Sequence, residues 1–422
     1  MANATHSRGI SVHRRARTLP PVAPLGPTVG PEDGDILAEL PTKLGGVLWR
    51  SLRSVRLWAG AIPAERVGLF NEGAYEARLA ELLSVEGPER LVADLSGLAT
   101  VLAGSAWVQP AVIAGHCAGV AAWARTESLR HITLCALRAA AECCPWDPAL
   151  ALHAGMEARD QVLYPEAESW LQRAVVLGRQ AGHWEIYTRA HLAMATMWLR
   201  RGALPTARRH LDRAEHRAGR AGLREFQGRA LHDRFVLEFS AGGEALHLAQ
   251  RALACYPAGS PRLIALAFDL SVYWMDRGNF EGALATSRVL LPRVQPEHRP
   301  NLYGVIARSA GACGVTSEYR RAVRALGDLP GAPGTASAWL CAAHGAVNLG
   351  LWEEARTHAQ RGLECALARR EQKVRFEAEG FLEMIEQKSR PAPPPELEEP
   401  AADAFTAELL ATIEALPVFS GA

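Results

Sequence analysis

Five glycines recur at nearly constant spacing, and this regularity is what most limits the folds open to the chain. Successive members are separated by 40, 36, 36 and 36 residues: Gly202, Gly242, Gly278, Gly314 and Gly350. Each follows an apolar run with helical spacing, as in the segment WMDRGNFEGAL (274–284), and a second helix-forming run comes after it. Because glycine adopts the left-handed conformation that ends many helices, each is predicted to close the first helix of a hairpin.

Small residues recur at a fixed place after the glycine. Ala207, Ala283 and Ala355 stand at the fifth position, Tyr319 fills that place in one unit, and Ala245 serves where the turn after Gly242 looks two residues shorter. A period of 34–40 residues with two helices is typical of an α-solenoid. A lone hairpin cannot bury its apolar face, so each unit must stack on the next, and small residues let the helices approach. Two further second helices are expected at 126–140 and 166–178.

Three segments, 192–214, 266–290 and 342–363, resemble the tetratricopeptide repeat (TPR) family. One unit matches the family pattern at Ala195, Trp198, Gly202, Ala207, Leu211 and Ala214, and another at Ser271, Trp274, Gly278, Phe280, Ala283 and Leu290. The resemblance is clear over about 185–365 and faint over 113–185. It departs from the family at Gly304 and Gly311, which weaken a first helix, and in the missing closing prolines. The resemblance implies an all-α fold, a right-handed α-solenoid of TPR-like helical hairpins with atypical N-terminal helices.

Composition divides the chain into five parts. Residues 1–40 are expected to form a disordered tail because they are polar and rich in proline and glycine. Residues 41–112, with an amphipathic helix at 44–58, are expected to cap an array of TPR-like repeats at 113–387. Residues 388–403 form a proline-rich acidic linker, which proline keeps extended.

The last part, residues 404–422, is a short amphipathic helix. Phe405, Leu409, Ile413 and Leu416 share one face at helical spacing. A free helix of this length is marginal in water, so that face should be buried against another surface. Docking onto the chain's own repeats is favoured, because a tethered segment has a high effective concentration. Insertion into a partner's groove as a helix ligand is the alternative.

Charge and apolar patterning exclude several function classes. The net charge of +1, from 46 basic and 45 acidic residues, gives no sign of a nucleic-acid partner. The Arg- and His-rich stretch 207–226 is interpreted as a solvated helix face, with a patch for an acidic partner as the alternative. Residues 95–124 lack charged side chains, but Pro110 should divide them into a buried helical hairpin rather than a membrane span.

The N-terminus and the cysteines bear on localisation. No apolar run follows the arginines near the N-terminus, so no secretory signal is expected. The eight cysteines have no C-x-x-C spacing and are interpreted as buried thiols in a reducing compartment rather than zinc ligands. A cytoplasmic protein without a metal or cofactor is therefore expected. The strong preference for arginine over lysine suggests a GC-rich, bacterial genome.

Two motifs point weakly to enzymes. GHCAG (115–119) matches a variant nucleophile elbow, which needs a strand before it, whereas its surroundings look helical. His232-Asp233 resembles the metal-binding dyad of HD-type phosphohydrolases, but its flanks fit a repeat helix. Walker-type, G-x-G-x-x-G and H-E-x-x-H motifs are missing from the sequence. The chain is therefore predicted not to be an enzyme.

The resemblance to TPR proteins implies a binding groove lined by the first helix of each unit. Carried over unit by unit, the groove positions are Arg189, Thr196, Arg200, Arg229, His232, Phe268, Val272, Asp276, Arg308, His344 and Asn348. The four arginines could clamp carboxylates or phosphates, because guanidinium is a bidentate donor. Alternatively they pair with Asp233, Asp269 and Asp276 inside the groove.

These expectations favour a protein–protein interaction scaffold or adaptor that binds a peptide or partner protein in its concave groove. Neither nucleic acid nor a membrane is expected as a partner. The alternative is a regulatory protein of transcription or signalling that senses a ligand or peptide and whose output partner is on another chain.

Overall fold

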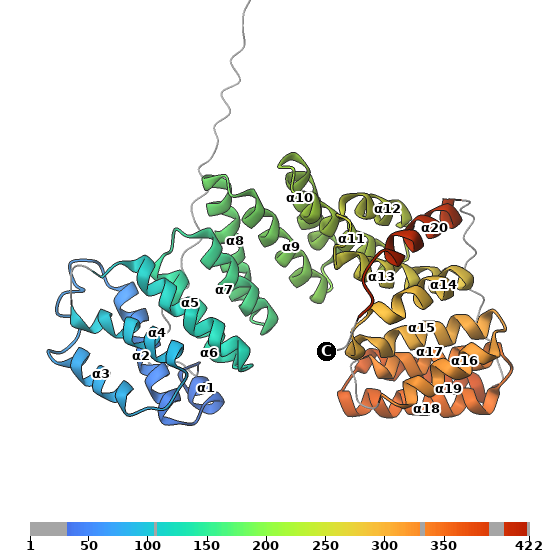
Figure 1. Ribbon diagram of the computed structural model, residues 1–422, viewed down its shortest axis with the longest axis horizontal. Helices are drawn as coiled ribbons and strands as arrows, with labels where there is room; N and C mark the ends of the chain where they lie inside the picture. The colour runs from blue at the N-terminus through green and yellow to red at the C-terminus, as the bar shows by residue number, and fades with distance from the viewer. Residues whose placement is uncertain (1–31, 105–107, 330–333, 388–400, 420–422) are drawn as a thin grey trace, which may run out of the picture. The chain divides into compact units, whose positions relative to one another are not determined.

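The computed structural model describes residues 32–104, 108–329, 334–387 and 401–419 (Figure 1). All regular secondary structure in these ranges is helical, without a strand, which confirms the predicted all-α class. By its packing the chain divides into two compact units, Met1–Leu223 and Arg224–Ala422. Each unit is described by itself.

The first unit begins with atypical helices and continues into helical hairpins. Its helices are α1 (Glu32–Glu39), α2 (Lys43–Gly60), α3 (Ala74–Leu83), α4 (Glu89–Ala99), the 3-10 helix η1 (Thr100–Ala103), α5 (Pro110–Thr126), α6 (Arg130–Cys143), α7 (Pro148–Asp160), α8 (Tyr164–Ala181), α9 (Trp184–Arg200) and α10 (Leu204–Arg220). Three hairpins, α5–α6, α7–α8 and α9–α10, make up its repeats.

The second unit contains four hairpins followed by two further helices. They are α11 (Arg224–Ser240), α12 (Leu246–Cys255), α13 (Arg262–Asp276), α14 (Phe280–Leu290), the 3-10 helices η2 (Leu291–Arg293) and η3 (Pro296–His298), α15 (Arg299–Ala312), α16 (Thr316–Gly327), α17 (Thr335–Asn348), α18 (Trp352–Arg369), α19 (Gln372–Glu386) and α20 (Ala401–Glu414). The hairpins are α11–α12, α13–α14, α15–α16 and α17–α18.

The five spaced glycines all close first helices, as predicted. Their φ angles lie between 73° and 83°, in the left-handed region. The two earlier hairpins use Ser128 (φ 60°) and Val162 (φ 65°) at the equivalent turn. Because neither residue is glycine, the repeat was faint there. The turn after Gly242 is longer than its counterparts, not shorter, since α12 begins only at Leu246.

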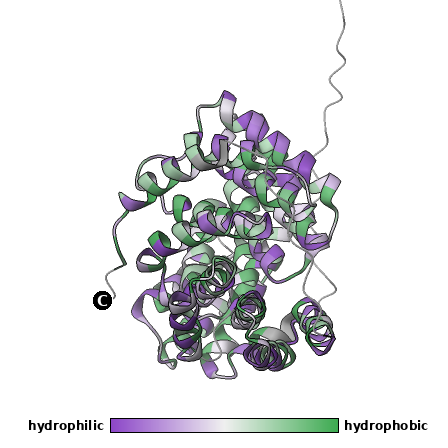
Figure 2. Cartoon of the chain, turned by 90° about the vertical axis from the view of Figure 1, so that its right-hand side faces the viewer, coloured by the Kyte–Doolittle hydropathy of each residue, from purple (hydrophilic) through white to green (hydrophobic). Residues whose placement is uncertain are grey.

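The small residues after the turns are buried at the contacts between helices. Ala207, Ala245, Ala283, Ala355 and Tyr319 are all fully buried. Figure 2 shows that individual helices carry hydrophobic and hydrophilic residues on different parts of their circumference. This amphipathic pattern is what the stacking of hairpins requires, because one face of each helix must leave water.

The glycines predicted to weaken the first helix of the Gly314 unit have a packing role instead. α15 is continuous, and a Cβ on Gly304 would lie 2.7 Å from Cα of Ala338 in α17. A Cβ on Gly311 would lie 2.3 Å from the carbonyl oxygen of Gly345, and one on Gly345 2.4 Å from that of Ala307. Two neighbouring first helices therefore approach at backbone distance, which only glycine permits at these positions.

The uncharged run 95–124 is divided as predicted. α4 ends at Ala99, Pro110 occupies the first turn of α5, and the two helices pack together. Proline fits the first turn of a helix because its missing N–H has no intrahelical partner there. Among the described residues, no helix is both long and apolar enough to cross a membrane.

The expectation of a disordered tail over 1–40 is wrong for residues 32–39, which form α1. Ile36 is buried in the core of the first unit. The Glu39 carboxylate accepts hydrogen bonds from the backbone N–H groups of His131 (3.1 Å) and Ile132 (2.9 Å), at the start of α6. Composition did not reveal α1, because one apolar side chain and one capping carboxylate anchor it. Residues 1–31 lie outside the described ranges.

The C-terminal helix docks on its own chain. Phe405, Leu409, Ile413 and Leu416 are at most 5% exposed and join the core of the second unit. α20 packs against α12, α13 and α14 (Figure 1), and the Phe405 ring lies 6.4 Å from that of Trp274. Two of these three helices are second helices of their hairpins. Docking onto the chain's own helices, which the sequence favoured, is therefore the arrangement observed. Linker residues 388–400 lie outside the described ranges.

The end of α20 is also held by polar contacts. Arg293 donates hydrogen bonds to the carbonyl oxygens of Leu416 (3.1 Å) and Glu414 (2.9 Å). The Phe419 N–H donates to the carbonyl oxygen of Pro292 (2.9 Å). The two Arg293 bonds satisfy carbonyl groups at and just beyond the C-terminus of α20, which would otherwise lack an intrahelical partner.

Candidate functional site

The candidate groove residues of the first unit lie on α9. Arg189 pairs with Glu185 one turn earlier (3.5 Å), and the Thr196 hydroxyl donates to the carbonyl oxygen of Leu192 (3.1 Å). Arg200 reaches from α9 to Asp160 on α7 (3.5 Å). Arg200 thereby links one hairpin to another, whereas the contacts of Arg189 and Thr196 lie within α9.

In the second unit, two groove arginines are paired with acids. Arg229 lies 4.0 Å from Asp233 on the same helix, and Arg308 on α15 lies 3.2 Å from Asp276 on α13. Asp269 pairs with a histidine instead. Arg229 and Arg308 are thus both paired with acids, and their role as partner-binding residues stays a prediction.

His232 is a buried and satisfied histidine. Its Nε2 lies 2.8 Å from the Asp269 carboxylate on α13, and its Nδ1 lies 3.4 Å from the Tyr256 hydroxyl. Within the ranges that the structure describes, no group of three or more side chains is placed to hold a metal ion. The histidine of the HD-like motif therefore joins two repeat helices, as its flanking residues suggested.

The other groove candidates differ in exposure. Phe268 is half-buried against the core of the second unit, whereas Asn348 is exposed at the end of α17. The His344 ring packs against that of Phe381 at 4.0 Å. Burial, together with Arg308, lowers the pKa of His344 to about 3, so this imidazole is neutral at pH 7.

The GHCAG motif lies in the middle of α5, not after a strand. Cys117 is fully buried, and burial raises the pKa of its thiol well above the ordinary value. A Cβ on Gly119 would lie 2.1 Å from the Asp94 carboxylate of α4. Close helix packing, the interpretation favoured from the sequence, explains the glycine, and a buried neutral thiol is a poor nucleophile.

An open pocket of about 410 Å³ lies in the first unit, at the ends of the hairpins. It is lined by Arg125, Ser128, Arg130, Thr133, Glu157, Asp160 and Arg200. Only Arg200 was among the sequence-based candidates. The lining comes from the last turns of three first helices, α5, α7 and α9, and from the start of α6. Arg125 and Arg200, each in the last turn of a first helix, were the available signal.

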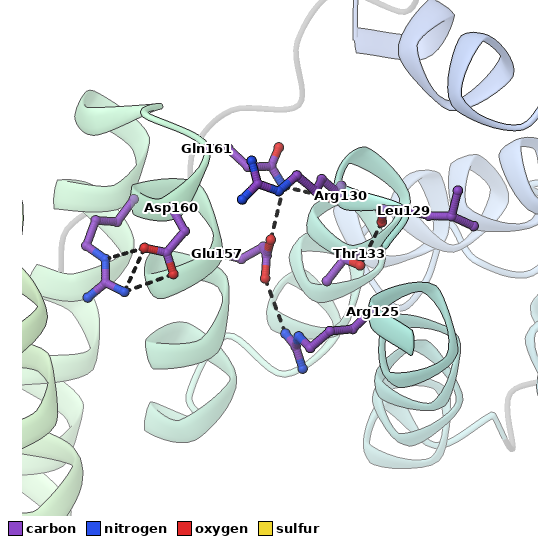
Figure 3. A network of polar contacts seen from close by, with 8 residues as sticks. Arg125, Leu129, Arg130, Thr133, Glu157, Asp160 and Gln161 are labelled. Atoms are coloured by element: carbon purple, nitrogen blue, oxygen red, sulfur yellow. Dashed lines mark hydrogen bonds and ion pairs between the residues drawn. The ribbon is translucent and has the colours of Figure 1, made fainter. Parts of the chain in front are cut away.

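Polar contacts connect the pocket walls (Figure 3). Arg125 lies 3.3 Å from Glu157, and Gln161 donates to Glu157 (3.2 Å) and to the carbonyl oxygen of Arg130 (2.6 Å). Asp160, besides its contact with Arg200, accepts two hydrogen bonds of 2.9 Å from the neighbouring Arg159.

Arg130 differs from the other two pocket arginines. No carboxylate of the described residues lies within ion-pair distance of its guanidinium, and the residue is exposed. The pocket therefore has one guanidinium without a carboxylate partner in that part of the chain, beside two that are paired.

Two residues with left-handed backbone, Ser128 and Val162, lie in or near the pocket-lining segments of the sequence. Ser128 lines it, and Val162 follows two residues after Asp160. Apart from Arg370 in the second unit, they are the only non-glycine residues with positive φ in the described ranges. A β-branched residue in this region is strained, and such outliers concentrate at functional sites.

Comparison with known proteins yields no family. No family model matches the chain, and no curated protein matches it. Among solved structures, a monomeric mutant of IFIT1 with Gppp-AAAA shares 14% identity over 78% of this chain and 72% of that one, with a TM-score of 0.42. A circular tandem repeat protein with novel repeat topology shares 14% identity over 85% and 87% of the two chains, with a TM-score of 0.17. Likenesses this distant say nothing about what this chain binds.

Proposed function

We propose that this chain is a TPR-like interaction protein, a scaffold or adaptor of the cytoplasm that binds a partner protein or peptide along its first helices. The observation that supports the proposal is a set of polar contacts between neighbouring first helices. Three such pairs join a residue of one hairpin to a residue of the next: Asp160–Arg200, His232–Asp269 and Asp276–Arg308.

Some of the charged side chains in these contacts remain exposed on the first helices. The side chains of Arg200 and Asp276 are 48% and 42% exposed. Exposed ion pairs contribute only about 0–1 kcal/mol to stability, so a partner can exchange them for its own polar groups at little cost to the fold. Weakly paired charges on the first helices of each unit suit recognition of another polypeptide.

A photo-crosslinking experiment tests this proposal. A photoreactive amino acid replaces Asn348, which is exposed at the end of first helix α17, and, as a matched control, Arg321, which is exposed on second helix α16. After irradiation of native host extract, the Asn348 variant should form a discrete adduct that the Arg321 variant lacks. Equal adducts from both variants, or none from either, would reject binding along the first helices.

A further inference from the structure

Resting on the proposed function, we propose that the pocket at the ends of α5, α7 and α9 binds the carboxylate of an acidic, partly apolar peptide segment of the partner. The pocket is defined by Arg125, Ser128, Arg130, Thr133, Glu157, Asp160 and Arg200. This segment would engage the edge of the first unit, in addition to contacts along the first-helix faces.

Three arginines from three different helices line the pocket. Arg125 lies in the last turn of α5, Arg130 begins α6, and Arg200 ends α9. Guanidinium presents parallel N–H donors that match the two oxygens of a carboxylate. Because Arg130 has no carboxylate partner among the described residues, it is the group that an incoming carboxylate meets first.

The other two arginines can contribute after a small rearrangement. The Arg125 and Arg200 side chains are 60% and 48% exposed, and their carboxylate partners lie at 3.3 Å and 3.5 Å. Ion pairs this exposed are weak, so turning a guanidinium toward a ligand costs little stability. Ser128 adds a hydroxyl at the rim.

The charge of the lining selects the type of anion. Three arginines face Glu157 and Asp160, which leaves a net charge of +1 on the pocket wall. One carboxylate neutralises that charge. A phosphate dianion would exceed it, and Glu157 would repel its two charges about twice as strongly as the single charge of a carboxylate. The pocket therefore fits a carboxylate better than a phosphate.

Exposed apolar residues that closely follow two lining residues in the sequence suggest what should flank that carboxylate. Val162, Leu163 and Leu204 are 61%, 40% and 36% exposed. Val162 and Leu163 lie in the turn after α7, and Leu204 begins α10 after the turn that follows α9; the last residues of α7 and α9, Asp160 and Arg200, line the pocket. A segment in which acidic and apolar residues alternate would meet both surfaces at once.

Fluorescence anisotropy with the full chain tests the inference. The probe is a short fluorescein-labelled peptide that alternates glutamate and leucine, and its control has glutamine in place of glutamate. The glutamate peptide should bind, and added salt should weaken it. Arg130→Ala should raise Kd about tenfold, the equivalent of losing about 1.4 kcal/mol, with Arg130→Lys in between. Arg179→Ala, an exposed arginine on α8 outside the pocket, should leave Kd unchanged.

Inorganic phosphate is the competing probe. At equal ionic strength it should displace the peptide no better than chloride does; efficient displacement would contradict the preference for a carboxylate. Absence of binding, equal binding of the glutamine peptide, or equal losses from Arg130→Ala and Arg179→Ala would each overturn the proposal. Circular dichroism checks that the variants fold, and Arg130→Gln replaces the alanine variant if that one does not.

The two proposals fail separately. The peptide is synthetic and the variants lie in the first unit, whereas the crosslinking positions lie in the second. A crosslinked partner together with Arg130-independent peptide binding would reject the pocket alone. Arg130-dependent peptide binding without an adduct at Asn348 would reject the first-helix face and retain the pocket.

Discussion

Replacing Val162 by glycine should stabilise the first unit, although it removes an apolar side chain. Val162 holds a φ of 65° at the turn that closes α7, where five later hairpins have glycine. The helix ends in the same way in both cases: Leu163 N–H donates to Ala158 O (2.9 Å), as Ala203 N–H donates to Trp198 O (2.9 Å). The backbone thus already has the geometry that glycine prefers.

Three effects set the size of the change. Relief of left-handed strain at a β-branched residue is worth roughly 2 kcal/mol. Glycine has more conformational freedom in the unfolded chain, which reduces this gain in stability by about 0.7 kcal/mol. Because Val162 is 61% exposed, the burial lost is only about 0.5 kcal/mol. The net expectation is a gain of about 1 kcal/mol in the free energy of unfolding, or a rise in Tm of about 2–4 °C for a unit of this size.

Urea denaturation followed by circular dichroism measures the change, with the reciprocal variant as matched control. Gly202→Val should lose about 1 kcal/mol, because a Cβ there has no heavy atom within 4 Å and only backbone strain is added. If Val162→Gly were destabilising, or if both variants changed stability in the same direction, the strain argument would be wrong.

Three further outcomes are expected. Leu409→Ala should cost about 3 kcal/mol in the free energy of unfolding, because the side chain is fully buried between α20 and the other helices of the second unit; a loss below about 1 kcal/mol would contradict the docking. Gly345→Ala should cost about 2 kcal/mol by overpacking against α15, whereas Gly380→Ala, whose Cβ meets nothing within 4 Å, should gain about 1 kcal/mol; thermal melts compare the two. Burial, with neighbouring charges, lowers the pKa of His191 to about 3 and of His210 to about 4. Below pH 6.5 the unfolded chain therefore binds more protons, so stability falls from pH 6.5 toward pH 4. His191→Phe should flatten that slope in denaturation curves recorded across this range, and an unchanged slope would argue against the shifted pKa.

The sequence alone determined the repeat class and much of the element order. Helical periodicity and left-handed glycines are local properties, so their spacing predicted five hairpins. The sequence also predicted that the apolar face of α20 is buried, without deciding which surface covers it. The earlier hairpins were faint because Ser128 and Val162 occupy the turn, and a strained residue leaves no compositional sign.

Tertiary structure alone decided which side chains meet. Gly304 and Gly311 look like helix breakers in sequence, yet they permit backbone contact between α15 and α17, a packing property of two helices rather than one. The pocket is similar, since Arg125, Glu157 and Arg200 are 32 and 43 residues apart and converge only when hairpins stack. The preference of a segment for a helix or a turn depends on neighbouring residues in the sequence. The pairing of charges between hairpins depends instead on the register in which the hairpins stack. That register arises only when the apolar faces are buried together.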